Sequence, residues 1–354
     1  MAPFLFAAAL ITQFGPIGPD MPAREPQMAA SGSTVVLTFG GGKAIYASVS
    51  HDSGKSFGVA VKVAESEILP LNRHRGPRIA MSGRTIVISA VGGTKAAEGT
   101  HAHGLPSDGD LWAWRSVDEG KTWSKGVRIN DVTGAPTEGL HTLAADTKGN
   151  LFAAWLDKRG EGTKLYAARS NDGGVTWTRN ALVYESPEGS ICQCCHPSAV
   201  FTADGTVAVM WRNWLGGSRD MYLSRSTDGF QFTKPERLGF GTWKLNACPM
   251  DGGGIVVSQG RLVTAWRREG EIFLAIPGEK EVSLGKGIDV AVAPAANGVY
   301  AVWTAPEGVV AMLPDKERLQ LAPIGSFPIV ISVGGGHALA AWETDGRIQI
   351  VRLP

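Results

Sequence analysis

The chain has 354 residues, of which 46 are glycine and 44% are hydrophobic, a composition typical of a turn-rich β protein with a sizeable core. Its formal net charge is +1, which argues against nucleic acid as a partner because no basic field would attract phosphates. No apolar run reaches the roughly 20 residues of a membrane-spanning helix, so we expect no transmembrane segment.

Residues 1–25 contain a short apolar run at positions 4–11. This run resembles the hydrophobic region of an export signal, although a basic segment before it and a clean cleavage site after it are missing. We expect an exported protein, periplasmic or extracellular. The alternative is that residues 1–25 are an N-terminal closing segment that packs on the fold. Residues 26–354 are expected to form a single domain, and we expect a monomer.

Four stretches repeat one turn pattern: residues 50–57 (SHDSGKSF), 116–123 (SVDEGKTW), 170–177 (SNDGGVTW) and, in degenerate form, 226–232 (STDGFQF). Each places an Asp two residues after a Ser, and the first three add a Gly, a Ser or Thr and an aromatic residue. The carboxylate can accept N–H groups within the turn, and the Gly can adopt positive φ. These stretches are therefore predicted to be stapled hairpin turns.

Apolar strands surround these turns at regular intervals. We predict paired first and second strands within residues 28–40, 78–92, 141–157, 198–213, 253–268, 290–305 and 329–344. Third strands are predicted at residues 44–50, 110–116, 164–170, 220–226, 271–277, 309–314 and 347–354. Seven units of this kind indicate an all-β, seven-bladed β-propeller. The last unit ends at its third strand, so the N-terminal segment could supply the fourth.

Strand direction assigns the loops to two faces. In an antiparallel blade, the starts of the first strands and the loops between second and third strands share one face. The repeated turns lie on the other face. On the first face the sequence places seven arginines and five histidines: Arg75, Arg78, Arg159, Arg212, Arg219, Arg267, Arg268, His74, His101, His103, His141 and His196. Because first strands line the channel of a propeller, these residues are expected to surround its mouth, where ligands bind in ring folds.

The repeated turns resemble the Asp-box, or BNR repeat, of the sialidase superfamily. Sialidases have six blades, so a six-bladed arrangement is the alternative to seven. The resemblance implies glycan hydrolysis of the exo-α-sialidase type, with an arginine triad on the substrate carboxylate, a tyrosine nucleophile paired with a glutamate, and an aspartate acid/base. Residues 74–80 (HRGPRIA) are the nearest match to the family's Arg-Ile-Pro motif, and they lack the Pro. No tyrosine matches the nucleophile convincingly.

We predict a ligand site for an anionic glycan at this mouth, because guanidinium groups bind carboxylates in bidentate fashion. Arg78, Arg212 and Arg267 are predicted to hold the anion. Asp251 or Glu138 is predicted to transfer the proton. The remaining candidate ligand-binding residues are Arg75, Arg219, Arg268 and His141.

The four cysteines are the feature that the family pattern does not explain. Cys192, Cys194, Cys195 and His196 open the fourth unit, and Cys248 opens the fifth, so all five side chains could be neighbours. Disulfides are one interpretation, with Cys248 joined to Cys192 or Cys194. A copper or zinc site is the second, because thiolates and imidazole suit both metals. Buried free thiols are the third.

Two further functions follow as alternatives to the glycan hypothesis. The first is a periplasmic copper- or zinc-binding propeller that uses the cysteine-rich segment and Cys248. The second is a non-catalytic interaction scaffold, because one fold can carry many functions.

Overall fold

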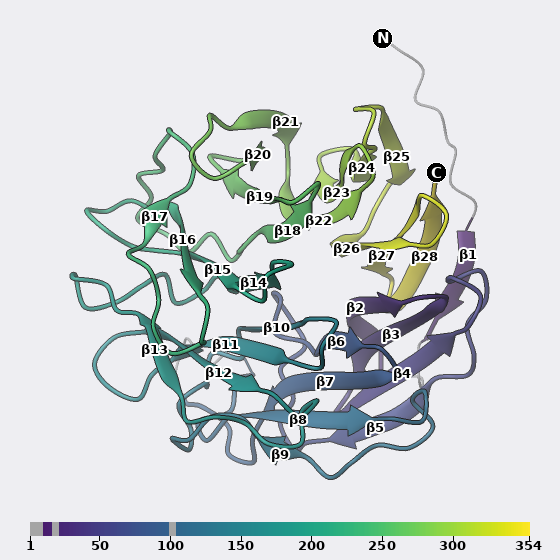
Figure 1. Ribbon diagram of the computed structural model, residues 1–354, viewed down its shortest axis with the longest axis horizontal. Helices are drawn as coiled ribbons and strands as arrows, with labels where there is room; N and C mark the ends of the chain where they lie inside the picture. The colour runs from purple at the N-terminus through teal and green to yellow at the C-terminus, as the bar shows by residue number, and fades with distance from the viewer. Residues whose placement is uncertain (1–9, 16–20, 99–103) are drawn as a thin grey trace.

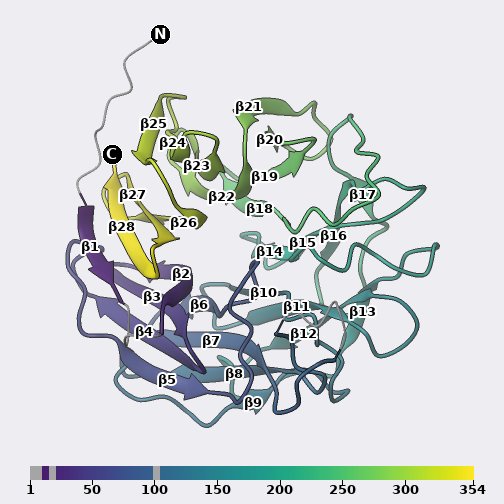
Figure 2. The same ribbon diagram turned by 180° about the vertical axis from the view of Figure 1, so that it is seen from behind.

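The computed structural model describes residues 10–15, 21–98 and 104–354, and within these ranges the regular elements are all β-strands. They form seven four-stranded sheets arranged as blades around a central axis (Figures 1 and 2). The predicted all-β, seven-bladed propeller is confirmed, and the six-bladed alternative is wrong. His101 and His103 lie outside the described residues. In the part of the chain that the structure describes, no helix could span a membrane.

Each blade is an antiparallel sheet whose innermost strand lines the channel, and the strands follow one another outward from it. Blade 1 contains β2 (Ala23–Ser31), β3 (Thr34–Gly41), β4 (Ala44–Ser50) and β5 (Val61–Glu65). Blade 2 contains β6 (Arg78–Ser82), β7 (Thr85–Gly92), β8 (Asp110–Ser116) and β9 (Val127–Arg128). Blade 3 contains β10 (His141–Ala145), β11 (Leu151–Asp157), β12 (Lys164–Ser170) and β13 (Ala181–Tyr184). Blade 4 contains β14 (Ser198–Phe201), β15 (Val207–Arg212), β16 (Met221–Ser226) and β17 (Glu236–Arg237).

The last three blades complete the ring. Blade 5 contains β18 (Gly254–Ser258), β19 (Arg261–Arg268), β20 (Glu271–Ala275) and β21 (Val282–Lys286). Blade 6 contains β22 (Ile288–Ala295), β23 (Gly298–Ala305), β24 (Gly308–Met312) and β25 (Arg318–Ala322). Blade 7 contains β26 (Ser326–Val333), β27 (His337–Thr344), β28 (Arg347–Leu353) and β1 (Leu10–Phe14).

Blade 7 is built from both ends of the chain. The N-terminal strand β1 pairs antiparallel with the C-terminal strand β28, with Gln13 opposite Gln349 and Phe14 opposite Ile348 (Figure 1). This pairing covers the outer edge that β28 would otherwise expose, and unpaired strand edges favour aggregation. An export signal in the preceding residues stays a prediction.

Large aromatic side chains on the second strands fill the spaces between blades. Trp155, Trp211, Trp303 and Trp342 are among the largest fully buried side chains. Blade 2 differs, because Ala90 occupies the corresponding position and Trp112 lies opposite it on the next strand. Each buried indole removes a large apolar surface from water, which holds neighbouring blades together.

The repeated turns form the staples that the sequence predicts. In the turn after β12, the Ser170 hydroxyl lies 2.7 Å from Asp172 Oδ1 and accepts the N–H of Gly174 at 2.8 Å. Asp172 also accepts the N–H and hydroxyl of Thr176. The same contacts recur in the turns after β4 and β8. Their Asp carboxylates therefore have structural partners within the turns.

We expect Ser170→Ala to destabilise the protein by about 1–3 kcal/mol, because it leaves the buried N–H of Gly174 without an acceptor. The free energy of unfolding, measured by urea denaturation, checks this prediction. Asn171→Ala in the same turn is the control, because Asn171 is exposed. It should change the free energy of unfolding by less than about 0.5 kcal/mol, as substitutions at surface sites usually do. Equal effects of the two variants would contradict the staple model.

Candidate functional site

A channel of about 200 Å³ runs along the propeller axis and is lined by residues of the innermost strands of all seven blades. Most of the residues that line it are apolar. The titratable side chains that line it are His74, Arg78, His196 and Asp289. Arg78 and Asp289 lie near the starts of their inner strands, and His74 and His196 lie in the loops before them. The polar end of the channel is therefore the mouth on the predicted ligand face.

Five side chains connect across this mouth, and we call Arg267, Asp251, Asp289, His74 and His196 the mouth cluster. Arg267 Nε lies 3.5 Å from Asp251 Oδ2, which also accepts the N–H of Asp289 at 3.0 Å. Asp289 Oδ1 lies 2.8 Å from His74 Nε2. The rings of His74 and His196 lie in contact, tilted by 38°, with their centroids 4.6 Å apart. Residues from distant parts of the sequence thus form one continuous polar chain.

Three buried polar atoms of the mouth cluster have no hydrogen-bond partner among the described residues: Asp251 Oδ1, His196 Nδ1 and Arg267 Nε. Buried polar atoms in folded proteins are nearly always paired, so such a group needs an explanation. The three atoms belong to one cluster, and one of its residues, His196, lines the channel. A polar molecule that reached the cluster from the channel would satisfy them. This is the arrangement expected of a ligand site.

The inner strands bend at the mouth. Glu25 in β2, Asp289 in β22 and Phe327 in β26 have φ values of 53°, 59° and 52°. Each lies where the register with the neighbouring strand shifts, which marks a β-bulge. Left-handed backbone is costly for residues other than glycine and concentrates at functional sites. Three equivalent bulges at one end of a channel support its assignment as the site.

Burial alters the acidity of the groups around the mouth. It raises the pKa of Asp251, with a further increase from the neighbouring Asp289. Burial also raises the pKa of Glu25, and it raises the pKa of Glu343 to about 7. Three acidic groups at the mouth are thereby shifted toward their neutral forms. The nearby arginines keep their charge. The mouth is therefore more electropositive than the numbers of its acidic and basic residues indicate.

The pKa values of the three histidines near the mouth are also shifted, in different directions. Burial opposes the charged form of His74, but Asp289 and Glu25 outweigh it and the pKa of His74 is raised. Burial and the neighbouring His74 hold the pKa of His196 well below its usual range. His141 is fully buried, its Nε2 lies 3.0 Å from Ser89 Oγ, and burial lowers its pKa to about 3. His74 is therefore the histidine most suited to carry charge beside a ligand.

Arg78, Arg212 and Arg267, predicted to hold the anion, all reach the mouth region and donate to acceptors within the protein. Arg78 donates to the carbonyls of His74, Gly76 and Pro77. Arg212 donates to the carbonyls of Asp251, Arg219 and Arg267. Arg267 donates to the Pro249 carbonyl at 2.6 Å. Among the described residues, neither Arg78 nor Arg212 forms an ion pair, so no carboxylate directly neutralises either guanidinium, although Glu25 lies near Arg78.

The other predicted residues lie farther out along the loops. Arg75 Nη2 lies 3.6 Å from Glu138 Oε2, and Lys158 pairs with the same carboxylate at 2.6 Å. Arg219 lies over the Trp214 ring, with its guanidinium carbon 4.7 Å from the ring centroid. Arg268 pairs with Glu281. These contacts fix the loops around the mouth, and none of these three arginines belongs to the mouth cluster.

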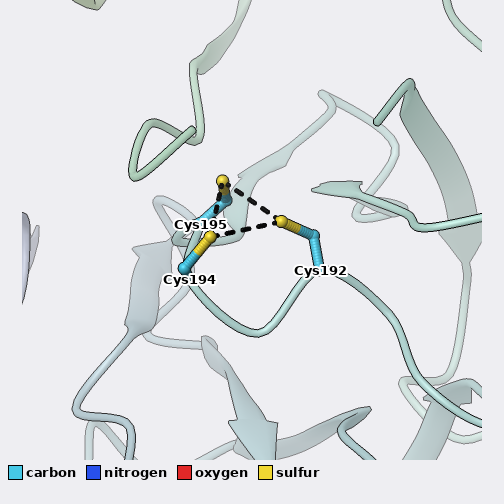
Figure 3. Close-up of side chains that lie close together, drawn as sticks. All are labelled: Cys192, Cys194 and Cys195. Atoms are coloured by element: carbon cyan, nitrogen blue, oxygen red, sulfur yellow. Dashed lines mark hydrogen bonds between the residues drawn. The ribbon is translucent and has the colours of Figure 1, made fainter. Parts of the chain in front are cut away.

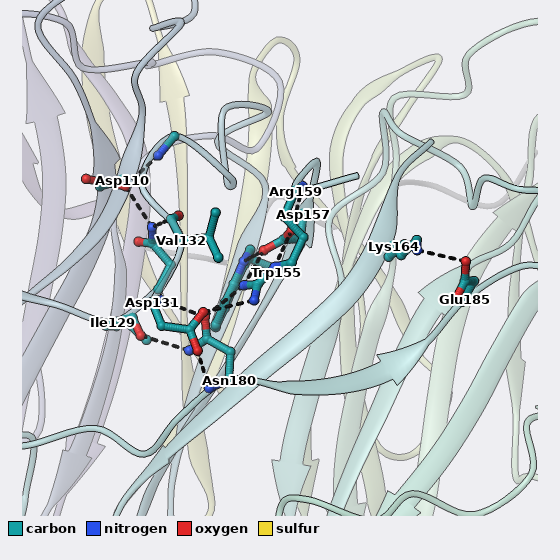
Figure 4. Close-up of polar contacts among 12 residues, drawn as sticks. Asp110, Ile129, Asp131, Val132, Trp155, Asp157, Arg159, Lys164, Asn180 and Glu185 are labelled. Carbon is teal, nitrogen blue, oxygen red and sulfur yellow. Dashed lines mark hydrogen bonds and ion pairs between the residues drawn. The ribbon is translucent and has the colours of Figure 1, made fainter. Parts of the chain in front are cut away.

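Arg159 belongs to a separate network between blades 2 and 3 (Figure 4). Its Nε and Nη2 each lie 2.9 Å from an oxygen of Asp157, and Nη1 lies 2.9 Å from Asp131 Oδ1. Asp157 also accepts the indole N–H of Trp155 at 2.7 Å. Asn180 joins the network by bonding Arg159 and Asp131. This arginine therefore joins blades and is not directed at the channel.

Three of the four cysteines form a cluster in the loop between β13 and β14 (Figure 3). The Cys192 sulfur lies 3.5 Å from those of Cys194 and Cys195, which are 3.9 Å apart. All three are buried, and all four cysteines of the chain are unbridged. Cys248 is exposed, and neither it nor His196 belongs to the group of close ligand atoms found among the described residues. Met250 packs against the three thiols instead.

Sequence reasoning missed Glu25, Asp289 and Met250. Glu25 precedes the predicted start of its strand, and Asp289 immediately precedes residue 290, where the prediction begins. The bulges carry both strands farther toward the mouth than hydrophobic alternation indicates. Met250 lies two residues after Cys248, and its sulfur would have been a reason to count it with the thiols. The clustering of positive φ angles has no signal in the sequence.

A larger pocket of about 650 Å³ lies between blades 1 and 2. Its lining includes Lys43, Asp108, Asp110, Trp112 and Trp114. Asp108 is tied to its own loop, because its carboxylate accepts the N–H groups of residues 94 and 95. The pocket combines aromatic rings with carboxylates, but its polar groups are satisfied to a greater extent than those of the mouth cluster.

Comparison with known proteins agrees with the fold and the repeated turns. The chain belongs to the BNR repeat-like domain family, whose model matches residues 44–263. A search of curated proteins finds no match. The resemblance to sialidase-like β-propellers is confirmed by solved structures that cover nearly the whole chain.

Three of these structures represent different enzymes. A leech intramolecular trans-sialidase, complexed with 2,7-anhydro-Neu5Ac, has a TM-score of 0.61 at 11% identity, covering 98% of this chain and 70% of that one. An α-L-arabinofuranosidase of Fusarium graminearum, complexed with arabinobiose, has a TM-score of 0.56 at 12% identity, covering 98% of each chain. An ulvan lyase bound to a GlcA–Rha3S chain has a TM-score of 0.58 at 11% identity, and the match covers 97% of this chain and 96% of that one. At such identities the similarity establishes the fold alone.

Proposed function

We propose that this protein binds the terminal acidic sugar of an anionic glycan at the channel mouth and hydrolyses the bond to the next sugar. The observation that carries this proposal is the trio of buried atoms without a hydrogen-bond partner on Asp251, His196 and Arg267, in a cluster that reaches the channel through His196. Structurally similar propellers act on glycans, and one of them is bound to a chain containing glucuronic acid. The proposal extends that class of ligand to this chain.

The charge of the mouth favours an anion. Arg78, Arg212 and Arg267 gather there, and Arg78 lines the channel itself. Burial shifts Glu25, Asp251 and Glu343 toward their neutral forms, which leaves the guanidinium charges less compensated. A sugar carboxylate would supply the missing negative charge and accept from Arg267 Nε. The channel volume of about 200 Å³ is below the usual range for whole ligands, so it suits a single terminal ring.

Asp251 is the group that we assign to proton transfer. Burial raises its pKa, which is the direction that a general acid needs in order to donate a proton to a leaving glycosidic oxygen. Its buried Oδ1 atom has no hydrogen-bond partner among the described residues. Glu138 is less suited, because Lys158 and Arg75 hold its carboxylate in ion pairs.

We expect Asp251→Asn to lower kcat/KM on an aryl glycoside of an acidic sugar by about 10²–10⁴-fold, the usual contribution of a general acid. The assay would compare sialic acid and glucuronic acid glycosides with neutral arabinofuranosides. Asp172→Asn, on the opposite face, is the matched control and should retain full activity. Urea unfolding of both variants would verify that they fold.

The binding step has its own test. Arg267→Gln should weaken calorimetric binding of the free acidic sugar by at least about tenfold, the loss of one charge-assisted hydrogen bond. Full activity of Asp251→Asn, or failure of every acidic sugar to bind the wild-type protein, would contradict the proposed function.

A further inference from the structure

The cysteine cluster, Cys192, Cys194 and Cys195, has geometry that neither disulfide bonding nor ordinary packing requires. Its sulfurs lie 3.5, 3.5 and 3.9 Å apart, whereas bonded sulfurs lie about 2.0 Å apart. The three side chains leave one short loop and point toward a common centre (Figure 3). Sulfurs placed tetrahedrally around a metal at about 2.3 Å would be separated by about 3.8 Å. The cluster thus matches the spacing of three thiolate ligands.

The surroundings of this cluster are rich in sulfur and poor in oxygen. Met250 packs against the three thiols, and its φ of 61° places it in an uncommon backbone conformation. Within the described residues, no carboxylate or imidazole joins the three sulfurs as a close ligand atom. Thiolate and thioether ligands select copper(I), whereas structural zinc requires four firm ligands. The donor set therefore favours copper(I).

Buried guanidinium groups supply the charge that such a site needs. Three thiolates with one monovalent ion carry two net negative charges, which are costly to bury without compensation. The positive charges of Arg212 and Arg219 act on Cys192, and that of Arg75 acts on Cys194. Arg212 is almost fully buried and has no carboxylate partner in the described part of the chain. Its charge is therefore available to balance the cluster.

We propose that Cys192, Cys194 and Cys195 bind one copper(I) ion through their sulfurs, with the thioether of Met250 as a weaker additional ligand. This ligand set replaces His196 and Cys248, which the sequence placed beside the thiols, by Met250. Its ligand atoms differ from those of the mouth cluster, but the two sites adjoin: Cys195 and Met250 directly precede His196 and Asp251, and Arg212 contacts both. The proposal does not depend on the glycan function. It assigns a role to the one sequence motif that the repeat family does not explain.

The test is an anaerobic titration of the reduced full-length protein with copper(I) in competition with a chromogenic chelator. The wild-type protein should bind one ion per chain. Cys194→Ser should lower the affinity by at least about 100-fold, and Met250→Leu by about tenfold. Cys248→Ser is the matched control, because Cys248 is exposed and lies outside the cluster, and it should retain wild-type affinity. X-ray absorption should show sulfur as the sole type of ligand atom.

Three results would overturn the proposal. The first is that the reduced wild-type protein takes up no copper(I). The second is that it binds one zinc(II) ion per chain in preference to copper(I), which would contradict the assignment of copper(I) as the metal. The third is that absorption spectra of the loaded wild-type protein show nitrogen or oxygen ligands. The last measurement uses the wild-type protein alone. It therefore tests the proposal even if Cys194→Ser does not fold.

Discussion

Asp157→Ala should lower the free energy of unfolding by about 3 kcal/mol, the largest loss that we expect from a single substitution outside the mouth. The Asp157 carboxylate is inaccessible and accepts from Trp155, from two nitrogens of Arg159 and from the Arg159 backbone. Removing it leaves a largely buried guanidinium and a buried indole N–H without their acceptor. Arg159 keeps Asp131 as a partner, which holds the loss at the lower end of the range for a broken buried pair.

Asp131→Ala is the matched control for this network. Asp131 pairs with the same Arg159 but its side chain is 45% exposed, so solvent replaces it readily. We expect a loss of less than about 1 kcal/mol. Urea denaturation of both variants at neutral pH measures the difference. Equal losses would contradict the conclusion that the buried half of the network joins blades 2 and 3.

Glu343 should make the protein less stable as the pH rises from about 4.5 to 7. Burial raises the pKa of this carboxyl from its ordinary value of 4.5 to about 7, although the N–H of Glu25 opposes the shift. The folded state therefore binds a proton more tightly than the unfolded state, and this stabilisation is lost as the proton leaves. A shift of this size corresponds to about 3 kcal/mol. Nearby Glu25, Arg24 and His74 also act on this carboxyl.

Glu343→Gln should remove this dependence while keeping an acceptor for the Glu25 N–H. Measured against the wild type, the variant should gain about 3 kcal/mol of relative stability between pH 4.5 and 7.5. Glu281→Gln is the control, because the pKa of Glu281 is shifted in the opposite direction. Burial opposes ionisation there, but the Phe240 N–H and Arg268 lower the pKa of Glu281 to about 2. Its effect should be nearly constant across the same interval. A wild-type-like pH profile for Glu343→Gln would contradict the buried-carboxyl assignment.

The fold could be predicted from the sequence because its determinants are local and repeated. The contacts of Ser170, Asp172 and Thr176 lie within seven residues of chain, so the pattern alone indicates the turn. Blade 2 is harder to recognise by its second strand, since Ala90 replaces the usual aromatic residue and a tryptophan, Trp112, lies opposite it on the adjacent strand. The repeated turn at residues 116–123 identifies the blade nevertheless.

The candidate site was predicted in location but not in composition. Strand direction placed the arginines, histidines and cysteines on the mouth face. The inner strands of blades 1, 6 and 7, however, begin at Ala23, Ile288 and Ser326, before the predicted starts at residues 28, 290 and 329. Bulges extend these strands and bring Glu25 and Asp289 to the mouth. Such bulges depend on contacts between blades, which a periodic pattern does not encode.

The cysteine-rich segment shows the same limit. Its thiols were expected beside Cys248 because two loops of neighbouring blades approach each other. The loops do approach, but Met250, with its φ of 61°, packs on the thiols while Cys248 stays exposed. A difference of two residues in one loop thus changes the set of side chains around the sulfurs.

A crystal structure of the protein with a bound acidic sugar would test the central claim most directly. We predict the sugar at the channel mouth, with its carboxylate at Arg267 and polar groups on Asp251 Oδ1 and His196 Nδ1. A sugar bound instead against Trp112 and Trp114 in the pocket between blades 1 and 2 would contradict the assignment of the mouth cluster as the ligand site.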